Sequence, residues 1–257
     1  MSLLSYDGSI EGLFSVIAVV MEEELEPSAI CAAEKMHCGD LFAQPRHITT
    51  DEERVHALLQ KLKPLCDRRT FRQILYVYFS EDDEAALLIC RYVLLLLERN
   101  APVYSDLTHP VVNRFHRLAR KVSRECHRYQ GLLRFEAIRD LDDEVLLGCF
   151  APDHNLVALL MPYFCERMAS EAFILYDIRR NFGMYHRGGD VFEVCFPRQT
   201  RERLRQFHRL HVEPDRFEEL WRRYFQSASI ESRYNPRLQR NIMPRKYWSF
   251  LTEMSGE

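Results

Sequence analysis

Several short motifs that mark common enzyme classes are missing from this sequence. It contains no G-x-S-x-G, no Walker loop and no G-x-G-x-x-G stretch, which argues against a nucleophile elbow or a standard nucleotide-binding loop. No H-x-E stretch has a P-C-x-x-C partner, which excludes a zinc deaminase. No C-x-x-C pair occurs among the eight cysteines, so a zinc ribbon or a ferredoxin-type cluster is not expected.

Leader-like and membrane-spanning segments are also absent. The apolar run Leu13–Met21 follows two acids and has no basic residue before it, unlike a signal peptide. The run Ala85–Leu97 is too short to span a bilayer and contains Arg91. Because the scattered cysteines are typical of reduced thiols, we expect a cytoplasmic protein without a membrane partner.

The composition is that of a chain with a packed core. Of 257 residues, 47% are hydrophobic and 28% charged, and the net charge is −3. This net charge argues against non-specific coating of nucleic acid, so any site for a polyanion must be local. Bases gather in 114–134, 198–209 and 233–246, whereas acids gather in 22–26, 51–53 and 81–84.

Hydrophobic periodicity predicts a single α+β domain over 1–257. The half 1–131 is predicted to be helical, with a short edge strand at Ser2–Tyr6 and an irregular segment at 25–47. The part 132–197 is predicted to hold a central antiparallel sheet of about four or five strands, packed by helices. Helices and a basic arm follow in 198–257. Further helices are predicted at 10–21, 53–62, 69–79, 81–99 and 154–168.

The helix with the clearest end signals lies within Thr108–Phe135. Thr108 or His109 can cap it, Pro110 suits its first turn and Gly131 its end. One stripe is apolar: Val112, Phe115, Ala119, Val122, Cys126 and Tyr129. A basic stripe lies nearly opposite: Arg114, Arg117, Lys121, Arg124 and Arg128. The basic stripe fits either a solvated helix face or a surface that meets a phosphate backbone.

Four stretches make the chain resemble a bacterial domain of unknown function described as a probable DNA-metabolism protein. The stretches are YDGSIEGLFSVI at 6–17, V-x-x-E-x-H-R-x-x-G-x-x-R-F at 122–135, D-H-N-L at 153–156 with PYF at 162–164, and R-x-N-P-R-x-Q-R-x-x-M-P-R-x-Y-W at 233–248. The last is the most specific, because many residue types stand at set spacings.

The resemblance implies a role in DNA repair or modification. In that family the domain occurs alone or in front of a uracil-DNA-glycosylase-like domain, and its gene tends to neighbour one for a radical-SAM protein. We therefore expect an accessory protein that binds DNA and works with a radical-SAM partner. Because no glycosylase-like portion is present here, base-excision chemistry is expected from a glycosylase-like partner. No cofactor of the chain's own is expected.

Two alternatives stay open. The chain could be an enzyme acting on DNA, with Glu125, His127 and His154 as the catalytic candidates. It could also be an interaction subunit whose basic surface meets an acidic protein and never touches DNA. Within the helix, Glu125 is predicted to pair with Lys121 or Arg128, and it does not share a face with His127.

Arginines, amides and aromatic rings supply the nucleic-acid-binding candidates, because guanidinium groups suit phosphate oxygens and rings can stack on bases. They are Arg117, Lys121, Arg124, Arg128, Arg134, Arg233, Asn235, Arg237, Gln239, Arg240, Arg245, Tyr247 and Trp248. The same residues are equally compatible with a C-terminal arm that packs against the rest of the protein and buries its aromatic rings in the core.

Two other charged or ligand-rich segments have ordinary explanations. Asp177 with Arg179 and Arg180 fits a site at the sheet edge or a charged turn. The segment 31–47 carries Cys31, His37, Cys38 and His47, but these spacings fit no standard metal site, and no metal is predicted.

Overall fold

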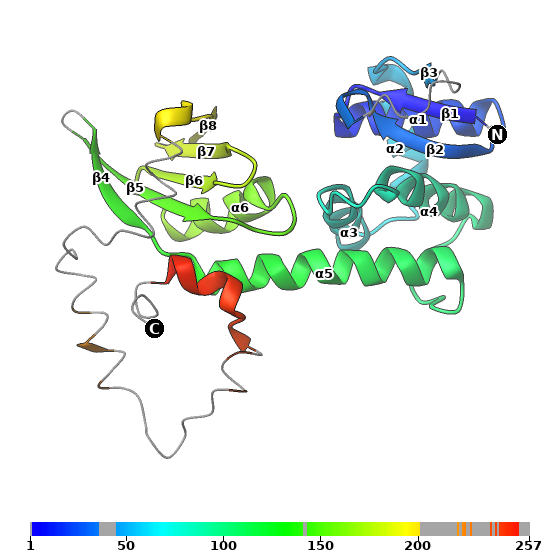
Figure 1. Cartoon of the computed structure of the whole chain (residues 1–257). Coiled ribbons are helices and arrows are strands. Elements are labelled where there is room, and N and C mark those ends of the chain that lie inside the picture. Colours follow the sequence, from blue (N-terminus) through cyan, green and yellow to red (C-terminus); the bar gives the residue numbers. More distant parts are fainter. Residues whose placement is uncertain are drawn as a thin grey trace. The chain divides into compact units, whose positions relative to one another are not determined.

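A computed structural model describes residues 2–35, 45–140, 143–200, 220, 223, 224, 227, 237, 240 and 242–251 (Figure 1). The chain divides into two compact units, Met1–Arg124 and Glu125–Glu257. The boundary falls inside the helix α5, Pro110–Leu132.

The first unit contains a small parallel sheet that the sequence did not predict. Strands β1 (Ser2–Tyr6), β2 (Pro27–Ala32) and β3 (Arg46–His47) lie in the order β2-β1-β3. β1 is therefore the central strand and not an edge, and 25–47 is not irregular throughout. Helix α1 (Ile10–Glu22) supplies the crossover that two parallel strands require between β1 and β2.

Polar side chains cap the start of three helices in the first unit. Ser9 caps α1, Asp51 caps α2 (Glu52–Leu62), and Asp67 caps α3 (Arg68–Tyr78). The hydroxyl of Thr50, just before the cap of α2, donates to Asp7. Helix α4 (Ala85–Arg99) begins later than predicted, because Glu81 has a φ of 57°, which a right-handed helix cannot include.

Helix α5 begins at Pro110 as predicted, and the carbonyl of His109 accepts the N–H of Asn113. It runs through Gly131, where its end was expected, and ends at Leu132. The predicted apolar stripe is confirmed, because all of its members are buried: Val112, Phe115, Ala119, Val122, Cys126 and Tyr129. The burial of this stripe leaves the opposite, basic side of the helix to solvent.

The second unit is built on a five-stranded sheet of β4 (Glu136–Asp140), β5 (Asp143–Phe150), β6 (Phe173–Asp177), β7 (Phe182–Arg187) and β8 (Asp190–Val194). The strands follow this order across the sheet. The predicted sheet is confirmed, but it is mixed and not purely antiparallel, because β5 and β6 are parallel. The reason is helix α6 (Val157–Arg167), which carries the chain back across the sheet between these two strands.

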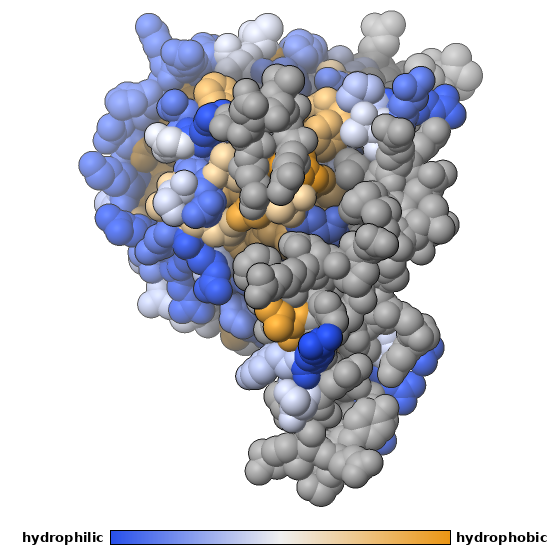
Figure 2. All heavy atoms as spheres, turned by 90° about the vertical axis from the view of Figure 1, so that its left-hand side faces the viewer, coloured by the Kyte–Doolittle hydropathy of each residue, from blue (hydrophilic) through white to orange (hydrophobic). Residues whose placement is uncertain are grey.

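Apolar side chains gather on both faces of this sheet. On one face Val145, Leu147, Cys149, Ile174, Tyr176 and Ile178 form a cluster. Against this cluster packs Phe250, from the 3₁₀ helix η3 (Arg245–Phe250). Figure 2, which views the molecule from the left-hand side of Figure 1, shows hydrophobic residues gathered in the middle with hydrophilic residues around them. The fold class is thus α+β, as predicted.

The structure describes only the first residues of the basic helix that was predicted in 198–257. Residues 198–200 are helical, consistent with the start of the predicted basic helix, and the rest of that helix lies outside the described residues. Across the described ranges, no helix has both the length and the apolar character that a membrane crossing needs.

Candidate functional site

The centre of the candidate site is the buried carboxylate of Glu125 on α5. Its side chain is 5% exposed. One oxygen accepts the backbone N–H of Asp153 at 3.0 Å, and the other accepts that of His154 at 3.1 Å. The pairing with Lys121 or Arg128 that helical spacing offered is not found among the described contacts, because both oxygens of Glu125 are engaged by the loop 153–154 and by Lys246.

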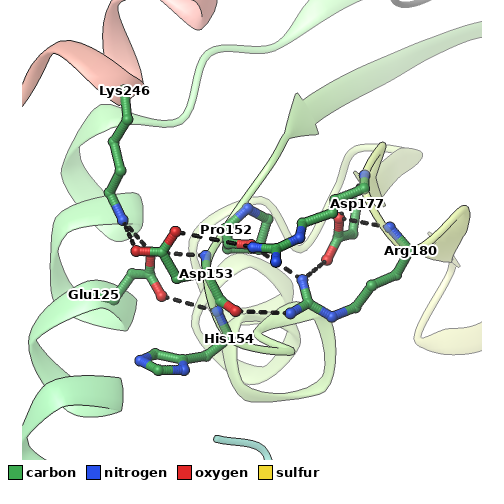
Figure 3. A network of polar contacts seen from close by, with 8 residues as sticks. Glu125, Pro152, Asp153, His154, Asp177, Arg180 and Lys246 are labelled. Carbon is green, nitrogen blue, oxygen red and sulfur yellow. Dashed lines mark hydrogen bonds and ion pairs between the residues drawn. The ribbon is translucent and has the colours of Figure 1, made fainter. Parts of the chain in front are cut away.

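Lys246, at the start of η3, joins this carboxylate to a second one. Its ammonium group lies 2.7 Å from an oxygen of Glu125 and also bonds a carboxylate oxygen of Asp153 (Figure 3). The lysine therefore bridges two acids that come from a helix and from the loop before α6. Its side chain is 37% exposed, so solvent reaches the pair from the lysine side.

Charges within the bridge shift two pKa values in opposite directions. Hydrogen bonding to Lys246 lowers the pKa of Asp153 below its ordinary value of 3.8. Burial by itself would lower the pKa of Lys246, but its bonds to Asp153 and Glu125 raise it well above the ordinary 10.5. Both shifts favour the ionised forms of Asp153 and Lys246 across the neutral pH range.

A second ion pair holds the other side of the same loop. Asp177, at the end of β6, is fully buried and accepts the backbone N–H groups of Arg179 and Arg180 at 2.8 and 3.1 Å. The Arg180 guanidinium lies 2.7 Å from Asp177 and also donates to the carbonyls of Pro152 and Asp153 at 3.1 and 2.9 Å. The charged turn predicted at 177–180 therefore anchors the loop 152–154 to the sheet edge.

Burial is the largest influence on the pKa of Asp177. It raises the pKa of this carboxyl, while the Arg180 guanidinium and the two N–H groups oppose the rise. Because Asp177 has no exposed surface, its charge depends on Arg180 for compensation.

The lysine bridge and the Asp177–Arg180 ion pair together form what we call the loop clamp: Glu125, Asp153, Asp177, Arg180 and Lys246. The loop clamp ties α5, the β5–α6 loop, the end of β6 and η3 to one another. Both oxygens of Glu125 are occupied by N–H donors and the lysine, an arrangement that fits a structural anchor. Three of the four stretches that carry the family resemblance meet here, at 122–135, 153–156 and 233–248.

The catalytic candidates are not brought into one constellation. His127 is exposed on α5, two residues from the buried Glu125, which places it on a different side of the helix. His154 is half-buried and contributes its backbone N–H to Glu125. Among the described residues, no group of three or more His, Cys, Asp or Glu side chains is arranged to hold a metal ion, and His37 and Cys38 lie outside those residues.

The basic side of α5 is the second feature of interest. Arg117, Lys121 and Arg124 are exposed, and Arg128 is half-buried. We call these four side chains the basic row. Within the part of the chain that the structure describes, no carboxylate pairs with any of them. Arg114, predicted to belong to the same stripe, instead pairs with Asp82 at 3.5 Å and with Glu84.

The remaining nucleic-acid candidates are dispersed. Tyr247 is buried against the ring of Tyr129, with centroids 5.0 Å apart, so its ring is not available to stack on a base. The indole N–H of Trp248 donates to the carbonyl of Met243 at 2.9 Å, and Arg245 lies over the indole at 5.6 Å. These contacts support the alternative in which the C-terminal arm packs against the rest of the protein.

The other six candidates are Arg134 and five residues of the C-terminal arm. Arg134 donates to the carbonyls of Gly131 and Leu133 at 3.2 and 3.4 Å and so caps the end of α5. Arg237 and Arg240 are exposed. Three candidates lie outside the described residues: Arg233, Asn235 and Gln239.

Sequence reasoning missed Lys246 and Asp153 as site residues. Lys246 stands at a position that the M-P-R-x-Y-W motif leaves open, so the motif gave no signal for it. A weak signal existed for Asp153, as the first residue of the D-H-N-L stretch.

The chain belongs to the DUF4130 family, a domain of unknown function. The family model matches residues 83–253, about two thirds of the chain. The match includes every residue of the loop clamp and of the basic row, whereas the stretch 6–17 lies before it. Among curated proteins, none matches the chain.

Proposed function

We propose that this chain is an accessory protein of DNA repair or modification that binds DNA through the basic row of α5. The observation that carries the proposal is that four cations at spacings of four, three and four residues have no described carboxylate partner. An exposed helix face of one charge sign, without local neutralisation, attracts a polyanion.

The geometry of a helix fits this partner. From Arg117 to Arg128 the helix rises roughly 16 Å at about 1.5 Å per residue. Duplex DNA carries one negative charge per roughly 3.4 Å of axis on each strand, so a basic row of this length can contact several phosphates. Guanidinium and ammonium groups on phosphates fix position and carry no sequence information directly, which suits an accessory role.

The neighbouring arginine provides an internal comparison. Arg114 extends the same stripe, but two acids from the segment before α4 neutralise it. Among the described residues, acids are thus placed against the first basic residue of the stripe and not against the next four. This contrast favours a partner supplied from outside the chain for the basic row.

The proposal includes a radical-SAM protein that performs the chemistry. This part rests on the family resemblance of the four sequence stretches. It predicts that the purified chain, mixed with a radical-SAM protein encoded beside it, forms a complex that elutes together in size-exclusion chromatography. Separate elution of the two proteins, with and without DNA, would contradict this part.

The DNA proposal predicts a salt-dependent loss of binding in the triple variant R117Q/K121Q/R124Q. Each phosphate contact contributes about 0.9 to the slope of log affinity against log salt on duplex DNA. The variant is therefore expected to lose affinity at least tenfold at low salt, with a shallower slope. Fluorescence anisotropy with single-stranded, duplex and uracil-containing DNA across a salt series measures both quantities.

The matched control is K61Q/K63Q/R68Q, which removes the same charge from exposed positions away from the basic row. It is expected to keep the wild-type slope. Equal losses in both triple variants would show a diffuse charge effect and remove the basic row from the proposal. No binding by the wild-type chain at low salt would refute direct DNA contact altogether.

A further inference from the structure

A pocket in the first unit gathers cations that neither the loop clamp nor the basic row uses. It encloses about 560 Å³ between α3, the segment before α5 and α5. This volume falls within the range of roughly 300–1,000 Å³ that is usual for small-molecule sites. The pocket also includes His116, Arg120 and Ser123 of α5.

Three guanidinium groups give the pocket its charge. Arg69 and Arg72 come from α3 and Arg120 from α5, and no described carboxylate forms an ion pair with any of them. The acid of the lining, Asp67, is engaged as the cap of α3 and accepts the backbone N–H and the hydroxyl of Thr70 at 2.7 and 2.8 Å. Three arginines against one engaged aspartate leave an excess of positive charge, which fits a phosphate group.

Two tyrosines supply a second kind of surface in the same pocket. Tyr76 is half-buried, and Tyr104 is exposed to an extent unusual for a large aromatic ring. Aromatic faces of this kind hold unstacked bases, because every base presents a flat π surface. A pocket with arginines and exposed tyrosines therefore matches a ligand that has both a phosphate and a planar ring.

His116 provides a second, independent observation that points to a ligand in this pocket. Its ring bonds the backbone of Tyr104, while Nε2 is buried without a hydrogen-bond partner among the described atoms. Burial lowers its pKa, and the nearby cations Arg69 and Arg120 lower it further. An anion held between these two arginines would cancel their effect, so His116 can report on the occupancy of the pocket.

We propose that this pocket binds a nucleotide phosphate, with the arginines on the phosphate and a tyrosine against the base. The same chemistry is offered by a free mononucleotide and by the 5′-phosphorylated end of a DNA strand. The proposal does not rest on DNA binding by the basic row, because the two sets of residues are separate and can be tested separately.

Calorimetric titration of the full chain with deoxyadenosine monophosphate, deoxyadenosine and inorganic phosphate tests the chemistry. The monophosphate is expected to bind at least tenfold more tightly than either the nucleoside or phosphate alone. Equal binding of phosphate and nucleotide would overturn the contact with the base, and equal binding of nucleoside and nucleotide would overturn the role of the arginines. Absence of binding to all three at millimolar concentration would overturn the site.

Variants and a second probe separate the sources of the ligand. The double variant R69Q/R120Q is expected to weaken nucleotide binding at least tenfold, while R68Q/R91Q, which removes the same charge from exposed positions outside the lining, leaves it unchanged. Short DNA with and without a 5′-phosphate then distinguishes a strand end from a free nucleotide. Wild-type affinity in R69Q/R120Q, or no upward shift of the His116 pKa by NMR on saturation, would refute the proposal.

Discussion

Replacing Arg180 by leucine should lower the free energy of unfolding by about 3–5 kcal/mol, because it leaves the buried charge of Asp177 without its counter-ion. The Arg180 side chain is 13% exposed, and Asp177 has no exposed surface at all. The substitution also removes the donors to the carbonyls of Pro152 and Asp153. Urea denaturation of the full chain at neutral pH measures the change.

Arg179 is the natural control, since it is the preceding residue of the same turn. Its side chain is 60% exposed, and its contacts with Pro152 and Asp153 are long, at 3.4 and 3.9 Å. The variant R179L is therefore expected to change stability by less than about 1 kcal/mol. A loss in R179L as large as that in R180L would contradict the assignment of the energy to the buried pair.

The pH dependence of the R180L variant gives a further check. Burial already raises the pKa of Asp177, and removal of the guanidinium is expected to raise it more. A carboxyl whose pKa is raised in the folded state costs stability only when it is ionised. The deficit of R180L should therefore shrink as the pH falls through that pKa, and D177N in the same background should restore part of the stability at neutral pH.

The second large effect is expected at the buried carboxylate of α5. In Glu125→Gln, an amide nitrogen replaces one acceptor oxygen, so one of the two backbone N–H groups loses its partner, and Lys246 retains only Asp153. Hydrogen bonds to charged groups contribute about 1.5–3 kcal/mol each, and solvent at the half-exposed lysine offsets part of the loss. We expect the free energy of unfolding to fall by about 2–4 kcal/mol.

Glu98→Gln on α4 is the matched control, because that glutamate is exposed and has no described partner. The double variant E125Q/K246M should cost less than the sum of its single substitutions, since the two residues share one interaction. Strict additivity in this cycle would show that Lys246 and Glu125 do not stabilise each other.

The Lys246→Met variant also predicts a pH window. The pKa of Asp153 is lowered, so its ion pair contributes fully above 3.8 and is lost as the pH falls through the folded-state pKa. The pKa of Lys246 is raised, so its contribution is complete below 10.5 and lost as the pH rises through the folded-state pKa. The deficit of K246M should be constant near neutrality and shrink at both extremes.

The course of α5 shows how much local pattern can predict. Its apolar stripe, its start at Pro110 and the exposure of its basic side followed from helical periodicity and from the fixed φ of proline. The partners of Glu125 could not be predicted from helical periodicity. Helical spacing offered two nearby cations, but the orientation of the residue toward the protein interior depended on what packs against that side.

The two sheets show a similar division. Alternation and turn residues predicted a sheet of about four or five strands within 132–197, because these signals are local. They could not give the parallel pairing of β5 with β6, which depends on where α6 returns the chain. Nor could they show β1 as a central strand, because its neighbours begin at Pro27 and Arg46, far along the sequence.

By itself, the sequence determined the α+β class, the helices with strong end signals, the apolar stripe of α5 and the family resemblance. Only the tertiary structure decided that Lys246 meets Glu125, 121 residues away, and that Arg180 compensates a fully buried Asp177. The physical reason is that a charge is neutralised by whichever group folding brings within hydrogen-bond distance. Such partners come from segments that no local period or spacing connects.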